Sequence, residues 1–387
     1  MYKICFITTI SMTLNAFVIN LAKYIYETGE FEITFICNYD KEFEVSLPEY
    51  IKYIPVSMQR GVSISGFKAT VELMKVFREN KFDIIQYSTP NASCYSAIAG
   101  FLTRIPVRLY CQWGIAYVGF TGIKREFFKL IEKMVCKLST QVEPDSYSNL
   151  QFSHDEKLYP KYKGAVVWNG SAAGVDFNKF DINQKEKWRK EIRVKYEIPE
   201  DAFVYIFIGR ITKDKGINEL FKAYKLMNQE KNNRYLLLVG NCEITDDVNQ
   251  ELYKWSLIEE KVIYSGFTRE VEKYIAASDV YVLPSYREGF GSSVIEAEAM
   301  GIPVIVTRIP GPVNAMQEGV TGLVINKKSE KELLEAMKFL DENSSIRKDM
   351  GSQAFWFVKN NFEQQKLFGK IVQDRKNLIN DSIEEME

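Results

Sequence analysis

Apolar segments short enough to be buried strands alternate with stretches of helical periodicity along the whole chain. Strands separated by helices are typical of βαβ units, so the pattern predicts an α/β protein with parallel sheets. The series of strands occurs twice. The expected strands in the first half are YKICFIT (2–8), FEITFIC (31–37), IKYIPV (51–56), DIIQY (83–87), VRLYC (107–111), TQVE (140–143) and AVVW (165–168), and those in the second half are FVYIFIG (203–209), YLLLVG (235–240), VIYSG (262–266), VYVLP (280–284), PVIVT (303–307) and GLVI (322–325).

A glycine-rich, turn-like segment, WNGSAAGVDFNKF at residues 168–180, separates the two series. We therefore expect two Rossmann-like, doubly wound domains that face each other across a cleft, at residues 1–168 and 169–364. Two domains suit a chain of 387 residues. A helix over about residues 365–387 is expected to pack back on the first domain.

The mostly apolar N-terminal segment is interrupted by hydroxyl and amide side chains. This favours a strand to Thr8, a polar loop and a helix to about Thr28 over a signal peptide. No segment has the roughly 20 uninterrupted apolar residues that a membrane-spanning helix needs. We expect a cytoplasmic protein, either soluble or attached to the inner face of the cytoplasmic membrane, that does not span it.

Composition excludes several kinds of site. The chain contains one histidine, His154, which excludes a histidine-built metal site or triad, and His154 itself is interpreted as a surface or capping residue. The six cysteines are scattered singly and are interpreted as reduced core residues. Lysine plus arginine (50) balance aspartate plus glutamate (51), which gives no indication of nucleic-acid binding. We expect no metal and no cofactor.

The run SYREGFGSSVIEAEAMGIPVIVT, residues 285–307, is the most informative part of the sequence. A buried strand leads into the glycine-bracketed loop EGFG, which opens a helix that ends at Gly301. Ligands bind at the carboxyl ends of parallel strands, and the free N–H groups of a helix N-terminus attract phosphate. Glu288 in the loop and Glu296 in the helix are therefore expected to face one ligand, where each carboxylate accepts hydrogen bonds from a sugar diol.

A second candidate phosphate-binding segment is FIGRITKDKGINEL, residues 207–220. Arg210 follows a strand and Lys215 precedes a new helix, so both cations are expected in the cleft beside EGFG, where they would neutralise a diphosphate. Taken alone, this loop is equally consistent with a solvated charged segment. Together with the glutamate run, it favours a diphosphate site over an acid and base pair of the glycosidase kind.

Several motifs occur in register: GRITKDKGINEL, LLLVG, SGF, ASDVYVLPSYREGFGSSVIEAEAMGIPVIVT and TGLV. In this order they resemble the retaining glycosyltransferases of family 4, which have the two-domain GT-B fold. WNGSAAGVD and EFFKLIEKMVCKLST in the first half resemble the subset that builds bacterial capsule, O-antigen and related polysaccharides. The resemblance implies retaining, metal-independent transfer of a hexose or N-acetylhexosamine from a nucleotide sugar, expected to be UDP-linked, to a lipid diphosphate-linked saccharide. Two alternatives stay open: transfer to a soluble sugar, and a catalytically silent nucleotide-sugar-binding scaffold.

The resemblance also implies roles for individual residues. Glu288 would hold the donor hexose and Glu296 the ribose diol, while Arg210 and Lys215 would grip the diphosphate. The implied catalytic residues are Glu288, Arg210 and Lys215, and the implied nucleotide-sugar site adds Gly266, Phe267, Gly289, Phe290, Gly291, Ser292 and Glu296.

The first half departs from the family pattern at two places. Relatives commonly have a glycine pair in the first loop, where this chain has TTISMTLN, so the hydroxyls of Thr9, Ser11 and Thr13 are the candidates for acceptor binding. Relatives also commonly carry a histidine after the strand that here reads RLYCQWG. This chain instead offers Gln112 to bond to a sugar and Trp113 to stack on it, although a core position for Trp113 is at least as well supported.

The segment 123–140 has apolar positions at helical spacing, with Lys124, Arg125, Lys129, Lys133 and Lys137 among them. The favoured interpretation is an ordinary packed helix with a solvated face. The alternative is an interfacial helix that touches anionic lipid, which suits a lipid-linked acceptor.

Overall fold

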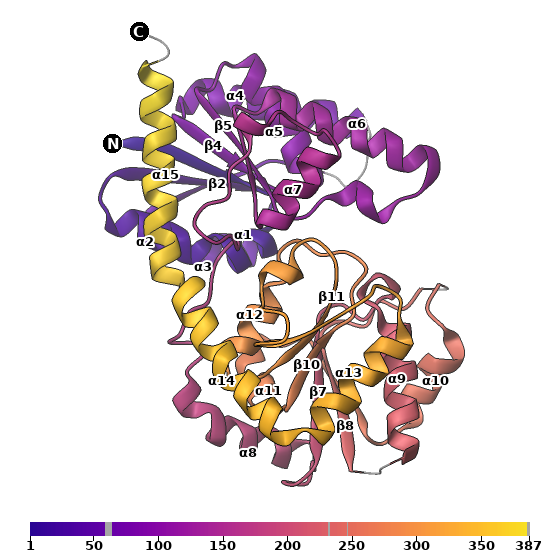
Figure 1. The fold of residues 1–387 in the computed structure, drawn as a ribbon. Coiled ribbons are helices and arrows are strands. Elements are labelled where there is room, and N and C mark those ends of the chain that lie inside the picture. Colours follow the sequence, from indigo (N-terminus) through magenta and orange to yellow (C-terminus); the bar gives the residue numbers. More distant parts are fainter. Residues whose placement is uncertain (59–63, 231–232, 246, 385–387) are drawn as a thin grey trace. The chain divides into compact units, whose positions relative to one another are not determined.

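The computed structural model describes residues 1–58, 64–230, 233–245 and 247–384, and these form two six-stranded parallel sheets. The predicted α/β class with two doubly wound sheets is confirmed (Figure 1). The chain divides into unit 1, residues 1–173 and 364–387, and unit 2, residues 174–363. The division falls a few residues beyond the expected 168/169, and the chain returns to unit 1 at Gln364.

Unit 1 has the strand order β3-β2-β1-β4-β5-β6. Its strands are β1 (Tyr2–Ile7), β2 (Phe31–Cys37), β3 (Ile51–Pro55), β4 (Ile84–Tyr87), β5 (Val107–Gln112) and β6 (Gln141–Pro144). Its helices are α1 (Ser11–Phe17), α2 (Ile19–Glu27), α3 (Lys41–Ser46), α4 (Ile64–Asn80), α5 (Pro90–Leu102), α6 (Gly122–Leu138), α7 (Tyr147–Asp155) and α15 (Gln364–Glu384), with short 3-10 turns at Ala116–Gly119 and Lys161–Lys163.

Both faces of this sheet are buried, which explains why its strands are almost wholly apolar. Alternate residues of a strand point to opposite faces, and β1 follows this rule. Ile4 and Phe6 enter the core that contains Ile84, whereas Cys5 and Ile7 enter the core on the other face. A strand with two dry faces can carry apolar residues at every position.

The last helix, α15, packs on the unit 1 sheet. Leu367 and Phe368 belong to the same core as Ile4 and Phe6. Farther along the helix, Arg375 is 1% exposed and its guanidinium donates to Gln86 Oε1 at 3.0 Å and to Glu143 Oε1 at 2.9 Å. A buried arginine of this kind is stable only because each of its donors finds an acceptor.

One expected strand of unit 1 was wrong, and the expected loop after β1 is present but short. AVVW at 165–168 is not a strand: Gly164 makes one isolated bridge to Val142, and Trp168 has a φ of +51°, which an extended strand does not allow. The expected polar loop after β1 is also very short. The Thr8 hydroxyl donates to the Ile10 carbonyl at 2.8 Å, so the chain turns within a few residues and α1 begins at Ser11.

Unit 2 has the strand order β12-β11-β10-β7-β8-β9. Its strands are β7 (Phe203–Ile208), β8 (Arg234–Val239), β9 (Val262–Gly266), β10 (Val280–Leu283), β11 (Val304–Thr307) and β12 (Gly322–Ile325). Its helices are α8 (Lys185–Lys195), α9 (Ile217–Glu230), α10 (Gln250–Ile258), α11 (Val271–Ala276), α12 (Ser292–Ala299), α13 (Glu330–Glu342) and α14 (Ser344–Asn361), with 3-10 turns at Ile182–Gln184, Lys213–Lys215 and Pro312–Asn314.

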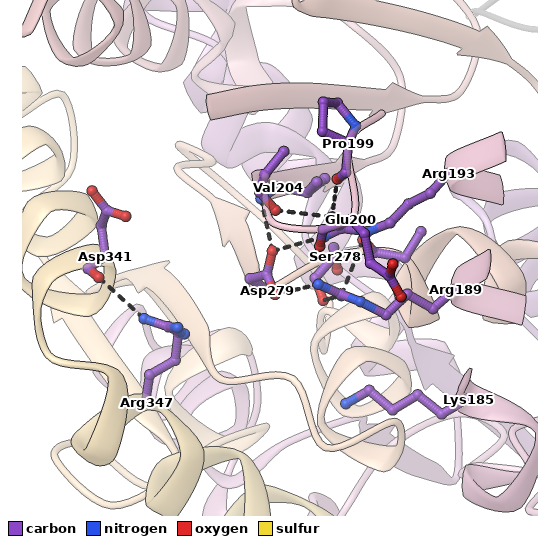
Figure 2. A network of polar contacts seen from close by, with 12 residues as sticks. Lys185, Arg189, Arg193, Pro199, Glu200, Val204, Ser278, Asp279, Asp341 and Arg347 are labelled. Atoms are coloured by element: carbon purple, nitrogen blue, oxygen red, sulfur yellow. Dashed lines mark hydrogen bonds and ion pairs between the residues drawn. The ribbon is translucent and has the colours of Figure 1, made fainter. Parts of the chain in front are cut away.

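An ion network around Asp279 holds the amino ends of the unit 2 strands (Figure 2). The Asp279 carboxylate accepts hydrogen bonds from Arg189 at 3.0 Å, from Arg193 at 3.1 Å and from the Val204 amide at 2.8 Å. The remaining donors of the Arg193 guanidinium bind the backbone carbonyls of Ala277, Pro199, Glu200 and Ala202. Helix α8 is thereby fixed to the start of the sheet, because a buried charge is stable only where all its donors are satisfied.

Candidate active site

The two loops selected by the sequence meet in unit 2. Strand β7 lies between β8 and β10, so the strand order reverses there, and residues 209–216 follow β7 while residues 284–291 follow β10. Ligands of open parallel sheets bind outside the carboxyl ends of the strands at such a switch point. The topology therefore brings both predicted phosphate signals to one place.

An ion pair joins the two loops. Lys215 Nζ lies 2.6 Å from Glu288 Oε1, and both side chains are mostly buried. The Ser285 hydroxyl donates to the same carboxylate oxygen at 2.7 Å. The close approach depends on Gly216, which has a φ of +74° and where a Cβ would lie 2.0 Å from the Pro284 carbonyl oxygen. A side chain at position 216 would therefore force the loops apart.

Arg210 lies at the same edge of the sheet but pairs with a different carboxylate. Its Nη1 is 3.0 Å from Oε2 of Glu243, which lies in the loop after β8, and both side chains are about half exposed. The structure thus brings Lys215 and Glu288 together and directs Arg210 toward the neighbouring loop.

Arg287 is a further cation at this edge, and the sequence analysis missed it. Its Nη2 is 3.0 Å from Asp214 Oδ2, and the Tyr286 amide donates to the Asp214 carbonyl at 2.8 Å. Burial would raise the pKa of Asp214, but the Thr212 hydroxyl and the Arg287 charge, with other nearby cations, outweigh burial and lower it. A signal was present, because Arg287 directly precedes Glu288 and Asp214 directly precedes Lys215.

The EGFG loop ends at the N-terminus of α12. Gly291 is the N-cap with a φ of +85°, and no side chain caps the helix there. The first-turn amides, beginning at Ser292, therefore form the kind of N-terminus that attracts anions. Phe290 is 3% exposed and its ring packs 5.2 Å from that of Phe362, so Phe290 and the neighbouring Gly289 offer only their backbone.

The charges of Glu296 and Glu288 both affect the buried hydroxyl of Tyr281. Tyr281, the second residue of β10, shares a hydrogen bond of 2.6 Å with the Ser293 hydroxyl on α12. Burial, followed by the charges of Glu288 and Glu296, raises the pKa of Tyr281. Burial also raises the pKa of Glu296, against the opposing charge of Lys179. The two glutamates therefore lie within electrostatic range of the same point.

Gly266 and Phe267 lie farther along the same edge. Gly266 ends β9, which is separated from β7 by β8, and has a φ of +73°. The Phe267 side chain is 61% exposed. An exposed aromatic ring at the carboxyl edge of a sheet suits stacking against a planar group.

The hydroxyls proposed for acceptor binding in unit 1 are largely engaged within the protein. The Thr9 side chain is buried, and its hydroxyl lies 2.8 Å from that of Thr89, in the loop after β4. The Ser11 hydroxyl donates to Asp40 Oδ2 at 2.5 Å. Thr13 lies partly exposed on α1. The Thr9 hydroxyl therefore ties two loops together, and its role in acceptor binding stays a prediction.

Gln112 is misplaced as an acceptor-binding residue. It is 0% exposed, its amide nitrogen donates to Glu132 at 2.6 Å, and its amide oxygen accepts from Ser153 at 2.8 Å. Trp113 packs against the Phe17 ring, with 5.4 Å between centroids, which agrees with the core interpretation.

His154 lies in the last turn of α7, with its ring 5.5 Å from that of Tyr159. It therefore packs against a neighbouring ring at the end of a unit 1 helix. In the part of the chain that the structure describes, no group of three or more His, Cys, Asp or Glu side chains is placed to hold a metal ion.

Comparisons with known proteins match both halves of the chain to glycosyltransferases. The family model "Glycosyl transferases group 1" matches residues 189–355, and "Glycosyl transferase 4-like" matches residues 3–146. The chain is 28% identical over 317 residues to the capsular polysaccharide biosynthesis glycosyltransferase CapM of Staphylococcus aureus, with 82% of each protein covered. It is 25% identical over 294 residues to the UDP-Gal:alpha-D-GlcNAc-diphosphoundecaprenol alpha-1,3-galactosyltransferase of Escherichia coli, with 73% of each covered. Among solved structures, Anabaena Alr3699/HepE in complex with UDP and glucose has the same fold, with a TM-score of 0.79 at 20% identity, over 97% of this chain and 100% of that one.

Proposed function

Because the chain is a GT-B glycosyltransferase, with a group 1 domain at residues 189–355 and a 4-like domain at residues 3–146, we propose that it transfers a sugar from a nucleotide donor to a lipid-linked acceptor. The sugar is a hexose or N-acetylhexosamine, the donor is UDP-linked, and the acceptor is a lipid diphosphate-linked saccharide of bacterial surface-polysaccharide synthesis. The relatives support this choice, since one is a capsule enzyme and the name of another carries both UDP-Gal and a diphosphoundecaprenol acceptor.

The observation that carries the proposal is the Lys215–Glu288 pair at the switch point. A fixed cation beside a carboxylate matches the two parts of a sugar diphosphate, because the cation binds phosphate oxygens and the carboxylate accepts from sugar hydroxyls. Arg210 and Arg287 add positive charge at the same edge. The N-terminus of α12 adds a helix dipole of the same sign.

Each part of the donor has a proposed partner. Glu288 accepts hydrogen bonds from the hexose hydroxyls, and Glu296 accepts them from the ribose diol. Burial makes the charged form of Glu296 costly, so two diol donors stabilise it strongly. The exposed ring of Phe267 lies against the base, and the amides at the start of α12 bind phosphate oxygens.

The proposed chemistry is transfer with retention and without a metal. The bond between the sugar C1 and the diphosphate oxygen breaks, and the acceptor oxygen forms a bond to C1 on the same face. A diphosphate oxygen takes the proton of the acceptor hydroxyl. Lys215, Arg210 and the amides of α12 stabilise the negative charge that develops on the diphosphate. Turnover is therefore expected to persist in EDTA.

The acceptor is assigned to unit 1, where α6 offers a surface for membrane contact. Ile123, Phe127 and Leu130 share one face of α6 and are 90%, 48% and 65% exposed. Lys124 lies beside them, with its Nζ 4.3 Å from the centroid of the Phe120 ring. None of the described helices is long and apolar enough to cross a bilayer. We therefore propose peripheral contact of this apolar and basic face with an anionic leaflet.

One experiment tests the donor and the acceptor together. The purified protein is incubated with a panel of nucleotide sugars and either a synthetic lipid diphosphate-linked sugar or free sugars, and the product linkage is determined by NMR. Consumption of a UDP-sugar only with the lipid acceptor, giving an α-linked product from an α-linked donor, is the expected result. Turnover on free sugar alone supports the soluble-acceptor alternative. If no donor is consumed and UDP does not raise the melting temperature, the proposal is wrong.

A matched experiment tests the membrane contact. The double variant Phe127→Ser, Leu130→Ser removes apolar area that is already exposed, so the fold is expected to be retained. Wild-type protein is expected to sediment with vesicles that contain phosphatidylglycerol and not with phosphatidylcholine alone, and the variant is expected to stay in solution. Equal sedimentation of both proteins would remove this surface from the proposal.

A further inference from the structure

Glu243 forms an ion pair with Arg210, a cation that the proposed function assigns to the donor diphosphate. This pair differs from the neighbouring pair in exposure: Arg210 and Glu243 are 50% and 48% exposed, whereas Lys215 and Glu288 are 18% and 11% exposed. An exposed pair contributes little free energy, whereas removing one partner of a buried pair is costly. Of the two cations assigned to the diphosphate, Arg210 is therefore the one that can move from carboxylate to phosphate at low cost.

The backbone holds Glu243 beside Arg210. Beyond the ends of β7 and β8, the Ile211 amide donates to the Asn241 carbonyl at 2.9 Å, and the Glu243 amide donates to the Ile211 carbonyl at 3.3 Å. Ile211 and Cys242 form a parallel bridge. The ladder between the strands thus continues into their loops. The position of Glu243 next to Arg210 follows from this register and not from the chance orientation of two long side chains.

From this arrangement we infer that Glu243 is a competing counter-ion for Arg210, a positioning residue that pairs with the guanidinium and takes it back when the nucleoside diphosphate leaves. The inference rests on the proposed function. A free nucleoside diphosphate carries a terminal phosphate with an additional ionisable oxygen, so it gains more from Arg210 than the nucleotide sugar does. Competition from Glu243 therefore weakens binding of the product, the nucleoside diphosphate, more than binding of the nucleotide sugar, and it favours release of the product.

The test removes the charge of Glu243 and keeps its size. With Glu243→Gln, the dissociation constant for UDP is expected to fall about two- to five-fold, which corresponds to the free energy of an exposed pair. The KM for the donor is expected to fall less than the inhibition constant of UDP. The difference from wild type is expected to disappear at about 1 M salt, where the Debye length is about 3 Å.

The matched control is Glu330→Gln. Glu330 pairs with Lys222 in the same unit, and these side chains are 47% and 48% exposed, so the same charge is removed from an equally exposed pair. Calorimetric titration with UDP is expected to give the wild-type affinity for this control. Unchanged or weaker UDP binding by Glu243→Gln would overturn the inference, and so would an equal gain in the control.

Arg210→Gln separates failure of the inference from failure of the proposed function. If wild-type protein binds none of UDP, GDP and ADP, or if Arg210→Gln leaves the affinity of the tightest of them unchanged, the diphosphate site itself is wrong. If Arg210→Gln weakens that nucleotide about ten-fold or more and Glu243→Gln has no effect, only the counter-ion role is wrong.

Discussion

The two edges of the unit 2 sheet both carry arginine–carboxylate pairs, but they use them differently. At the amino edge, Arg193 is 4% exposed as a side chain, Asp279 is 18% exposed, and the Arg193 guanidinium also binds four backbone carbonyls (Figure 2). At the carboxyl edge, Arg210 and Glu243 are half in water and make a single contact with each other. The saturated, buried network is suited to holding helices on the sheet, whereas the exposed pair leaves a cation that a ligand can take.

This difference follows from the direction of the strands. All pairings in the sheet are parallel, so one edge collects the ends of helices and the starts of strands, and the other collects the loops that leave the strands. Carbonyls of Ala277 and Ser278 at the end of α11 are available to arginines at the first edge. Free amides of helix N-termini are available to anions at the second.

The largest effect is expected for Arg193→Ala, which tests whether the network at the amino edge stabilises the fold. It leaves Asp279 with fewer partners and several buried carbonyls without donors, so the free energy of unfolding is expected to fall by about 3–5 kcal/mol. Urea denaturation measures this loss. Lys190→Ala, on the exposed face of the same helix, is the control. If Arg193→Ala does not accumulate in folded form, Arg193→Lys, which keeps the charge but not the fork of donors, is expected to show a partial loss. Unchanged stability in both would contradict the role of the network.

Lys215→Ala is expected to act on catalysis as well as on stability. Removing a fixed cation from the diphosphate site is expected to lower turnover about 100- to 1000-fold. It also leaves the mostly buried Glu288 carboxylate without its cation, so the unfolding midpoint is expected to fall, and rates are compared at a temperature where the variant is folded. Initial rates with a nucleotide sugar and acceptor give the kinetic effect. Lys213→Ala, in the same loop but 44% exposed, serves as the matched control and is expected to keep most of the activity. Equal losses in the two variants would show that the loop needs charge in general and not Lys215 in particular.

Glu298 is a buried carboxyl that has neither a saturated network of partners, as Arg193 has, nor exposure to water, as Arg210 has. It is 0% exposed and neither carboxyl oxygen makes a hydrogen bond of acceptable geometry, so burial raises its pKa well above the usual range and the nearby Thr321 hydroxyl offsets this only in part. Because the folded-state pKa is raised, the carboxyl lowers stability as the pH rises above its unfolded pKa. Glu298→Met is therefore expected to raise the unfolding free energy by about 1–3 kcal/mol at pH 8 and by less at pH 5. A difference that does not depend on pH would mean that packing and not ionisation is responsible.

Lys185 gives the smallest expected effect. It lies on α8 one turn before Arg189, and its Nζ donates to the Gly301 carbonyl at 3.3 Å. Burial, followed by the Arg189 charge, lowers the pKa of Lys185 to about 8. Below pH 8 the folded protein bears the cost of the charge, and this cost is relieved between pH 8 and the unfolded pKa of about 10.4.

Lys185→Met is accordingly expected to stabilise the fold by about 1 kcal/mol at pH 7, because water still reaches part of the side chain, and by less at pH 9.5. Denaturation curves of variant and wild type at the two pH values measure the difference. Lys187→Met removes a charge from the exposed face of the same helix and is the control. A gain that grows from pH 7 to pH 9.5 would contradict the assignment.

The sequence predicted the site in unit 2 better than that in unit 1. The loops GRITKDKG and EGFG carry glycines and charges whose meaning is local, and the topology brought them together as expected. The burial of Gln112 and the contact of Thr9 could not be predicted, because the direction of a polar side chain depends on partners elsewhere in the chain. Glu132 and Ser153 take the amide of Gln112, and Thr89 takes the hydroxyl of Thr9.

The sequence by itself determined the number and order of most strands, the two-unit organisation and the loops that carry the chemistry, because buried strands and left-handed glycines leave a local pattern. Only the tertiary structure decided which charge pairs with which. Lys215 and Glu288 are 73 residues apart, Arg210 and Glu243 are 33 apart, and Arg189 and Asp279 are 90 apart. The register of the sheet and the solvent exposure of each pair decide these pairings, and neither can be read from a single sequence motif.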